Sequence, residues 1–166
     1  MVSWAMRNNS RRARFRLPGD KESAMLATSP DSLDRFLDAQ KDSYDIALSE
    51  LTRGRKQSHW MWFIFPQLRG LGHSAMSHHY GIADADEAGR YLAHRVLGPR
   101  LIRCADAVLA HQGTAADRIF GSVDAAKLRS SATLFAAVPG APDVFDRILQ
   151  AFFDNRPCRT TLDRLD

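Results

Sequence analysis

Apolar residues recur along this chain at the spacing of a helix in one segment after another, and no stretch alternates in the two-residue pattern of a half-buried strand. The clearest case is residues 32–53, which Asp31 is placed to cap and Gly54 to end. With successive residues about 100° apart, one arc of this helix holds Leu33, Phe36, Leu37, Tyr44, Ala47, Leu48 and Leu51. Such a stripe packs on a core. We therefore predict an all-α fold.

The same periodicity, with caps and helix breakers, predicts the remaining elements. Asp84 and Glu87 have the spacing of a capping box, and Pro99 suits a first helical turn. The run at residues 60–65 is apolar on every side. It is a buried helix or strand, and the lack of a partner strand favours a helix, with Ser58 as a cap. Further helices are expected at residues 74–80, 84–93, 98–112, 114–121, 122–137, 142–154 and 160–165, with a loop at 66–73.

The length allows one domain with a real core, and we expect a single compact multi-helix domain at residues 31–166. Residues 1–30 carry six Lys/Arg and two Asp/Glu, which is the whole of the chain's net charge of +4. We predict a disordered basic tail, explained by an over-extended start before Met25 or by a basic arm that contacts nucleic acid or an anionic surface. The neutral remainder argues against nucleic-acid binding by the helical domain.

Several classes of protein are disfavoured. No apolar run approaches the roughly 20 residues of a membrane span, and no signal-peptide pattern is present, which favours the cytoplasm. A disulfide between Cys104 and Cys158 is not expected in a reducing compartment. His73, His78 and His79 lie near one another, but no spacing matches a zinc motif. We therefore expect no metal and no cofactor.

The helix expected at residues 122–137 carries polar residues in its apolar arc. The arc contains Val123, Leu128, Leu134 and Phe135, but also Asp124, Lys127 and Ser131, whereas Arg129 and Thr133 point elsewhere. One interpretation is a partly buried ion pair three residues apart. The other is a pocket in which Lys127 meets an anionic ligand and Asp124 orients it or moves a proton. Both stay open at this point.

Two further places invite the same question. Gln40 lies in the stripe of the first helix beside Tyr44 and is either a satisfied buried amide or a ligand-reading group. In residues 53–59, Lys56, Ser58 and His59 come just before an expected helix start. This segment is either an anion-binding site or a solvated basic turn. Trp60 and Trp62 are core residues or a stacking surface for a planar ligand.

The chain resembles the bacterial family of unknown function DUF1810 from about Asp31 to its end. The run His-Trp-Met-Trp-Phe-Ile-Phe-Pro-Gln at residues 59–67 is the most specific part. The resemblance also rests on residues 36–40, 54–58, 68, 70–72, 91–94, 97–101, 120–121 and 127–135. It implies an all-helical single domain but no activity. Family members are sometimes labelled calpastatin, which a compact core does not support.

The polar positions that match the family are Gln40, Lys56, Ser58, His59, Gln67, Asp124, Lys127 and Ser131. The sequence departs from the family pattern at Arg95, Val123, Ala125 and Cys158, where Pro, Pro, Asp and Asp are usual. Losing a second acid beside Asp124 weakens a mechanism based on paired carboxylates.

Our leading hypothesis is a protein that binds a small anionic or nucleotide-like ligand. If the protein is an enzyme, this ligand is its substrate. The pocket would lie between the first helix, residues 58–67 and the helix at 122–137. Lys56 and Lys127 would hold negative charge, Gln40 and Gln67 would read polar edges, and His59 or Asp124 would handle a proton. Tyr44, Ser58, Trp60 and Ser131 complete the set of candidate binding residues.

The alternative is a structural or adapter protein without a small ligand. It predicts no cleft, full internal pairing of Asp124 and Lys127, and an exposed apolar docking patch of several hundred Å².

Overall fold

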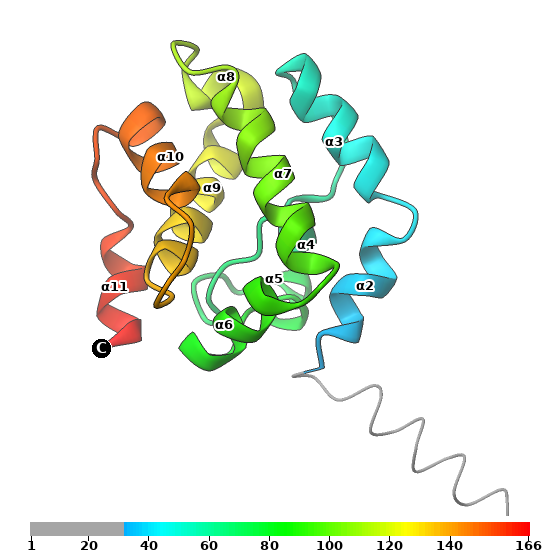
Figure 1. Ribbon diagram of the computed structural model, residues 1–166, viewed down its shortest axis with the longest axis vertical. Helices are drawn as coiled ribbons and strands as arrows, with labels where there is room; N and C mark the ends of the chain where they lie inside the picture. The colour runs from blue at the N-terminus through cyan, green and yellow to red at the C-terminus, as the bar shows by residue number, and fades with distance from the viewer. Residues whose placement is uncertain (1–31) are drawn as a thin grey trace, which may run out of the picture. The chain divides into compact units, whose positions relative to one another are not determined.

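Helices account for the regular structure of the computed structural model, which describes residues 32–166 (Figure 1). The expected tail at residues 1–30 and the expected cap Asp31 lie outside the described residues. The described part contains ten helices, and its only strand-like pairing is one parallel bridge between Leu68 and Ile82. The helices are α2 (Asp34–Gln40), α3 (Tyr44–Arg53), α4 (Met61–Ile64), α5 (Ala75–His79), α6 (Ala85–Ala93), α7 (Leu97–Leu109), α8 (Ala116–Phe120), α9 (Ser122–Ala136), α10 (Val144–Phe153) and α11 (Arg159–Leu165). The all-α prediction is confirmed, and residues 36–166 form one unit.

The single helix expected at residues 32–53 is wrong, because the chain turns between α2 and α3. The Ser43 N–H donates to the carbonyl oxygen of Gln40 over 3.2 Å, and α3 starts afresh at Tyr44. The turn is about as long as one helical repeat of about 3.6 residues. The apolar stripe therefore stays nearly in phase across the break, which hides it from the periodicity. Gly54 ends α3 as expected, in the left-handed region at φ 75°.

The apolar run at residues 60–65 forms the short helix α4, as favoured, and Met61, Phe63 and Ile64 are buried. Ser58 does not cap it, because α4 begins after Trp60 and no side chain caps its N-terminus. Ser58 instead uses its backbone N–H on the side chain of Glu50.

Asp84 caps α6 as expected, and Glu87 reaches back to the residue before Asp84. Asp84 Oδ1 accepts from the Glu87 N–H over 2.8 Å, and Glu87 Oε2 accepts from the Ala83 N–H over 3.1 Å. The next helix, α7, packs tightly on the end of α6. A Cβ on Gly98 would lie 2.1 Å from the carbonyl oxygen of Leu92, so only glycine fits there.

Helix α9 contacts α6, α8, α10 and α11, and α10 lies beside it in Figure 1. It is therefore buried on several sides and has no single polar face. The expectation that Thr133 points away from the core is wrong, since Thr133 is 2% exposed. Val123, placed in the apolar arc, is 69% exposed instead. A helical wheel assumes that a helix has a single buried face, whereas α9 is buried on more than one face.

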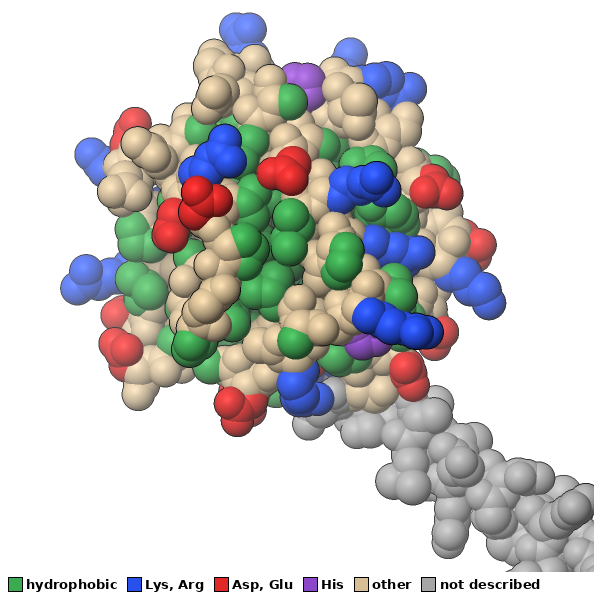
Figure 2. Space-filling view, viewed as in Figure 1, with side chains coloured by type: hydrophobic (Ala, Val, Ile, Leu, Met, Phe, Trp, Pro, Cys, Tyr) green, Lys and Arg blue, Asp and Glu red, His purple; other side chains and the backbone are tan. Residues whose placement is uncertain are grey.

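Figure 2 shows one apolar strip on the face of the molecule that it presents. Hydrophobic side chains gather in a strip between α7 and α10, with charged groups around it (Figure 2). The large apolar side chains that are exposed in the described residues lie on three separate helices, namely Ile46, Met76 and Val123. Within residues 32–166 no helix has the length and apolar character needed to cross a bilayer.

Candidate functional site

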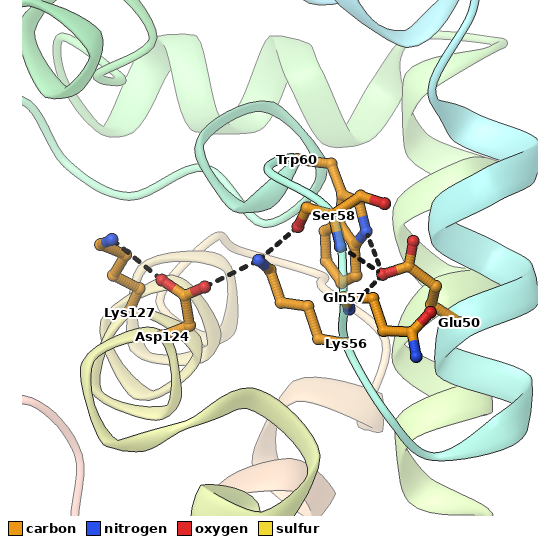
Figure 3. Close-up of polar contacts among 7 residues, drawn as sticks. All are labelled: Glu50, Lys56, Gln57, Ser58, Trp60, Asp124 and Lys127. Atoms are coloured by element: carbon orange, nitrogen blue, oxygen red, sulfur yellow. Dashed lines mark hydrogen bonds and ion pairs between the residues drawn. The ribbon is translucent and has the colours of Figure 1, made fainter.

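Asp124 lies between two lysines and bonds to both (Figure 3). Its Oδ2 is 2.9 Å from Lys56 Nζ, and its Oδ1 is 2.9 Å from Lys127 Nζ. Asp124 and Lys127 lie on the first two turns of α9, whereas Lys56 comes from the segment that follows α3. We call these three residues the Lys–Asp–Lys cluster. The ion pair that the spacing of Asp124 and Lys127 suggested is thus present, with a second lysine that the spacing did not suggest.

Each lysine of the cluster also rests on an indole. Lys127 Nζ lies 4.0 Å from the centre of the Trp62 ring, and Lys56 Nζ lies 5.0 Å from that of Trp60. Lys56 further donates to the carbonyl oxygen of Ser58 over 2.5 Å. A cation over an indole face is attracted by the ring quadrupole. The two tryptophans therefore hold both ammonium groups in place.

The cluster carries a net positive charge. Burial raises the pKa of the Asp124 carboxyl, but hydrogen bonds and charges from Lys56 and Lys127 lower it more, so that the pKa lies below its ordinary value. The carboxylate is therefore ionised at neutral pH, and it neutralises only one of its two ammonium neighbours. The side chains of Asp124 and Lys127 are each 19% exposed, against 8% for Lys56. Lys127 is therefore the lysine of the cluster that is more accessible to a molecule in solution.

Two backbone N–H groups in the segment where an anion site is expected, residues 53–59, bind a carboxylate of the chain itself. Glu50 Oε1 accepts from the backbone N–H groups of Gln57 and Ser58, the latter over 2.7 Å, and from the indole N–H of Trp60 over 3.2 Å (Figure 3). Burial raises the pKa of Glu50, but hydrogen bonds from Ser58, Gln57 and Trp60 outweigh this and lower it to about 2. Nothing in the periodicity singles out Glu50, because an acid at the edge of a stripe looks like a solvated residue.

A pocket of about 330 Å³ opens next to the cluster. We call it the Lys127 pocket, and its wall consists of Trp62 on α4, Gln67, Leu71 and Gly72 from the loop after α4, Ala126, Lys127 and Ser130 on α9, and Cys158 and Thr160 at the start of α11. Small-molecule sites span roughly 300–1,000 Å³. The pocket has the size of a site for a small ligand.

Gln67 is a polar residue of this wall. It is 9% exposed, and its side-chain amide makes no hydrogen bond within the part of the chain that the structure describes. Most buried polar groups are paired. An amide left unpaired at the edge of a pocket is therefore available to a ligand.

Cys158 precedes α11 and faces the same pocket. Its Sγ lies 3.3 Å from Ser130 Oγ, and its backbone N–H donates to Thr133 Oγ1 over 2.8 Å. Burial raises the pKa of the thiol, but the Ser130 hydroxyl and the N–H groups of Thr160 and Thr161 contribute to a net lowering. The other cysteine, Cys104, is fully buried, and burial raises its pKa to about 12.

Four of the predicted site residues belong neither to the pocket wall nor to the polar contacts around the cluster. The Gln40 amide donates to the carbonyl oxygen of Phe63 over 2.8 Å and to the Tyr91 hydroxyl over 3.1 Å. Tyr44 lies under the guanidinium of Arg100, which is 4.5 Å from its ring centre. Gln40 and Tyr44 thus have structural partners elsewhere. The other two are Ser131 and His59: Ser131 is buried off the pocket wall, and His59 is exposed and makes no hydrogen bond with described residues.

The structure brings together Lys56, Ser58, Trp60, Asp124 and Lys127, and it places Gln67 with Lys127 on the pocket wall. Sequence reasoning missed Ser130, Cys158 and Thr160, because their approach to residues 62–72 depends on how α9 and α11 pack. Among residues 32–166, no group of three or more His, Cys, Asp or Glu side chains is placed to hold a metal.

The fold and the site together define a small all-helical protein with a cationic pocket beside its central helix. The chain belongs to the family described as "Protein of unknown function (DUF1810)", which matches residues 30–165. It is similar to the conserved hypothetical protein Rv1873 from Mycobacterium tuberculosis, whose crystal structure shares 45% sequence identity and a TM-score of 0.79. That match covers 80% of this chain and 95% of the other. No curated protein matches the chain.

Proposed function

We propose that this protein binds a small anionic molecule, of which nucleotides are one class, in the Lys127 pocket. The observation that carries the proposal is the uneven charge of the Lys–Asp–Lys cluster, in which two ammonium groups share one carboxylate beside an open pocket. A charge that is partly withdrawn from water and only half neutralised favours a counterion. The ligand's negative group is the counterion that this proposal supplies.

Lys127 is the residue through which the cluster would meet the ligand. An ammonium group has three N–H donors, and in the described residues Asp124 takes one of those of Lys127. Lys56 is more buried and also donates to the Ser58 carbonyl oxygen. Lys127 would therefore contact the anion directly, while Lys56 holds Asp124 on its other side.

Gln67 supports the proposal independently. Its side-chain amide makes no hydrogen bond with described residues, so a ligand can pair with it without breaking a bond within the protein. Trp62 and Leu71 give the pocket an apolar wall for the uncharged part of the ligand. The catalytic roles considered for His59 and Asp124 stay predictions, because binding requires no proton transfer.

Thermal unfolding in the presence of defined probes tests the proposal. We expect inorganic phosphate or AMP to raise Tm, and adenosine, which lacks the phosphate, to have a smaller effect. A ligand at about 100 times its Kd adds about 2.7 kcal/mol of stability. Lys127→Met should abolish the gain and Gln67→Leu should weaken it. Arg147→Met removes an exposed cation from α10, away from the pocket, and serves as the matched control.

Two results would count against ligand binding. One is a panel of phosphates and carboxylates that leaves Tm unchanged, and the other is a gain that Lys127→Met and Arg147→Met retain equally. Either result favours the adapter alternative, for which the internal pairing of Asp124 with both lysines is the supporting observation. The adapter would then depend on surface contacts and not on the pocket.

A further inference from the structure

We propose that Cys158 is a reactive thiol that exchanges with small acidic disulfides admitted to the Lys127 pocket and becomes a mixed disulfide. The inference deepens the proposed function, because it rests on the pocket's preference for anions. It adds a covalent step and names the class of reactant, a low-molecular-weight disulfide that carries carboxylates.

The position of the thiol is the first argument. Cys158 lies on the pocket wall and is partly exposed, so that a small molecule in the pocket meets its Sγ. Lys127 lies on the wall of the same pocket. Gln67 also lines it; this residue is nine-tenths buried, and its side-chain amide makes no hydrogen bond with described residues, which is independent evidence that the pocket accepts a polar guest. The cation, the amide and the thiol therefore act on one bound molecule.

The surroundings of the sulfur favour its reactive form. Ser130 Oγ lies 3.3 Å from Cys158 Sγ and can donate to a thiolate. The net lowering of the pKa of Cys158 raises the thiolate fraction at neutral pH, and the thiolate is the nucleophile in exchange. Cys104 is the opposite case, fully buried and with its pKa raised to about 12. The chain contains two cysteines in all, so one reactive and one inert thiol are expected.

The exchange step balances without a further reactant. The thiol proton of Cys158 passes to water, and the thiolate attacks one sulfur of the disulfide. A new S–S bond forms to Cys158 as the old one breaks, and the electron pair leaves with the departing thiolate. Cys158 is oxidised to the mixed disulfide, and one half of the small molecule is reduced to a thiol. An external thiol reverses the reaction.

Charge selects the reactant. The Lys–Asp–Lys cluster leaves one positive charge next to the pocket, and a carboxylate on the disulfide pairs with Lys127 as the sulfur reaches Cys158. A pocket of about 330 Å³ admits a small disulfide and excludes a folded protein. Neutral disulfides lack the charge pairing and should gain nothing from Lys127.

Two aromatic disulfides separate these effects. 5,5′-Dithiobis(2-nitrobenzoate) carries two carboxylates, whereas 4,4′-dithiodipyridine is neutral at the same pH, and each releases a coloured thiol. We expect one fast-reacting thiol per native chain with either probe, and none in Cys158→Ser. Lys127→Met should slow the anionic probe about tenfold, as for the loss of one partly exposed charge pair, and the neutral probe less than twofold. Arg147→Met should change neither rate, and mass spectrometry should place the adduct on Cys158.

The result that would overturn the inference is a native thiol no faster than Cys158 in unfolded protein, or Lys127→Met slowing both probes alike. The reaction rates of the wild-type protein give a check that needs no substitution. Added salt should slow the reaction with the anionic probe far more than that with the neutral one. Failure of the proposed function is recognised separately. Phosphate and AMP contain no disulfide, so the Tm response of the wild-type protein to them reports anion binding alone.

Discussion

Ser131 Oγ is buried on α9 and finds no hydrogen-bond partner among the described residues, whereas its neighbour Ser130 contacts Cys158. Both residues are serines, and both lie within residues 127–135, one of the segments that carry the family resemblance. Ser131 is the serine predicted for the site, yet it is Ser130 that lines the pocket. Helical periodicity could not show which of the two serines reaches the pocket, because the direction of each hydroxyl depends on the helices that surround α9.

Ser131→Ala should stabilise the protein. Removing a buried hydroxyl that lacks a partner removes a desolvation cost of about 1–3 kcal/mol, offset by the small space that it leaves. We expect a gain of about 1 kcal/mol in the free energy of unfolding, measured by urea denaturation. Ser130→Ala is the matched control and should bring no gain, because it removes the contact with Cys158. A loss of stability in Ser131→Ala would show that this hydroxyl is satisfied.

Elements were largely predictable, and the failures have identifiable causes. The helices α5 to α11 begin and end within a few residues of the expected bounds, because Asp84, Pro99 and the apolar periodicity mark them locally. The break after Gln40 was missed because a turn near one helical repeat preserves the stripe. Ser58 was misread as a cap because the acceptor of its N–H, Glu50, lies on another helix.

The end of α3 offers a prediction at this scale. Gly54 has φ 75°, and a Cβ there would lie 2.9 Å from the imidazole of His111, whose Nε2 lies 2.9 Å from the Leu51 carbonyl oxygen and 3.1 Å from that of Thr52. Gly54→Ala should therefore cost the left-handed penalty of roughly 1–2 kcal/mol together with the displacement of His111. The free energy of unfolding measures the total.

Gly140→Ala isolates the backbone part of this cost. Gly140 has the same φ of 75°, but a Cβ there meets nothing within 4 Å. We expect Gly140→Ala to show the left-handed penalty alone, and Gly54→Ala to exceed it. Equal losses in the two variants would mean that His111 moves aside without cost and does not join α3 to the end of α7.

The site as a whole is a property of the folded molecule. The Lys127 pocket combines residues from α4, its following loop, α9 and the start of α11, and the longest of these separations runs from Trp62 to Thr160. Local pattern identified Lys56, Asp124 and Lys127 one at a time, through their chemistry, whereas Gln67 came from the family resemblance. It could not say that Gln40 has partners in the core or that residues 57 and 58 already hold a carboxylate. Both facts depend on contacts between distant segments.

Those contacts predict how the stability of the whole domain depends on pH. Glu50 and Asp124 both have a pKa lowered by their partners, so the folded protein binds fewer protons in acid than the unfolded chain does. The stabilisation is complete above the unfolded pKa, which is 4.5 for Glu50, and is lost as the pH falls through the folded pKa of about 2. For Glu50, which is 2% exposed, the pKa difference corresponds to up to about 3 kcal/mol.

Glu50→Gln isolates this contribution. The variant should be less stable than wild type at neutral pH, because it loses the carboxylate that binds the N–H groups of Gln57 and Ser58. The gap between the two unfolding free energies, measured in urea from pH 7 to pH 2, should close by up to about 3 kcal/mol as Glu50 becomes protonated in wild type. Asp146→Asn, at an exposed carboxylate on α10 without a hydrogen bond to described residues, should leave a gap that is small throughout. If the Glu50→Gln gap keeps the same width down to pH 2, the carboxylate of Glu50 does not hold residues 57–60 through its charge, and neutral hydrogen bonding accounts for that contact.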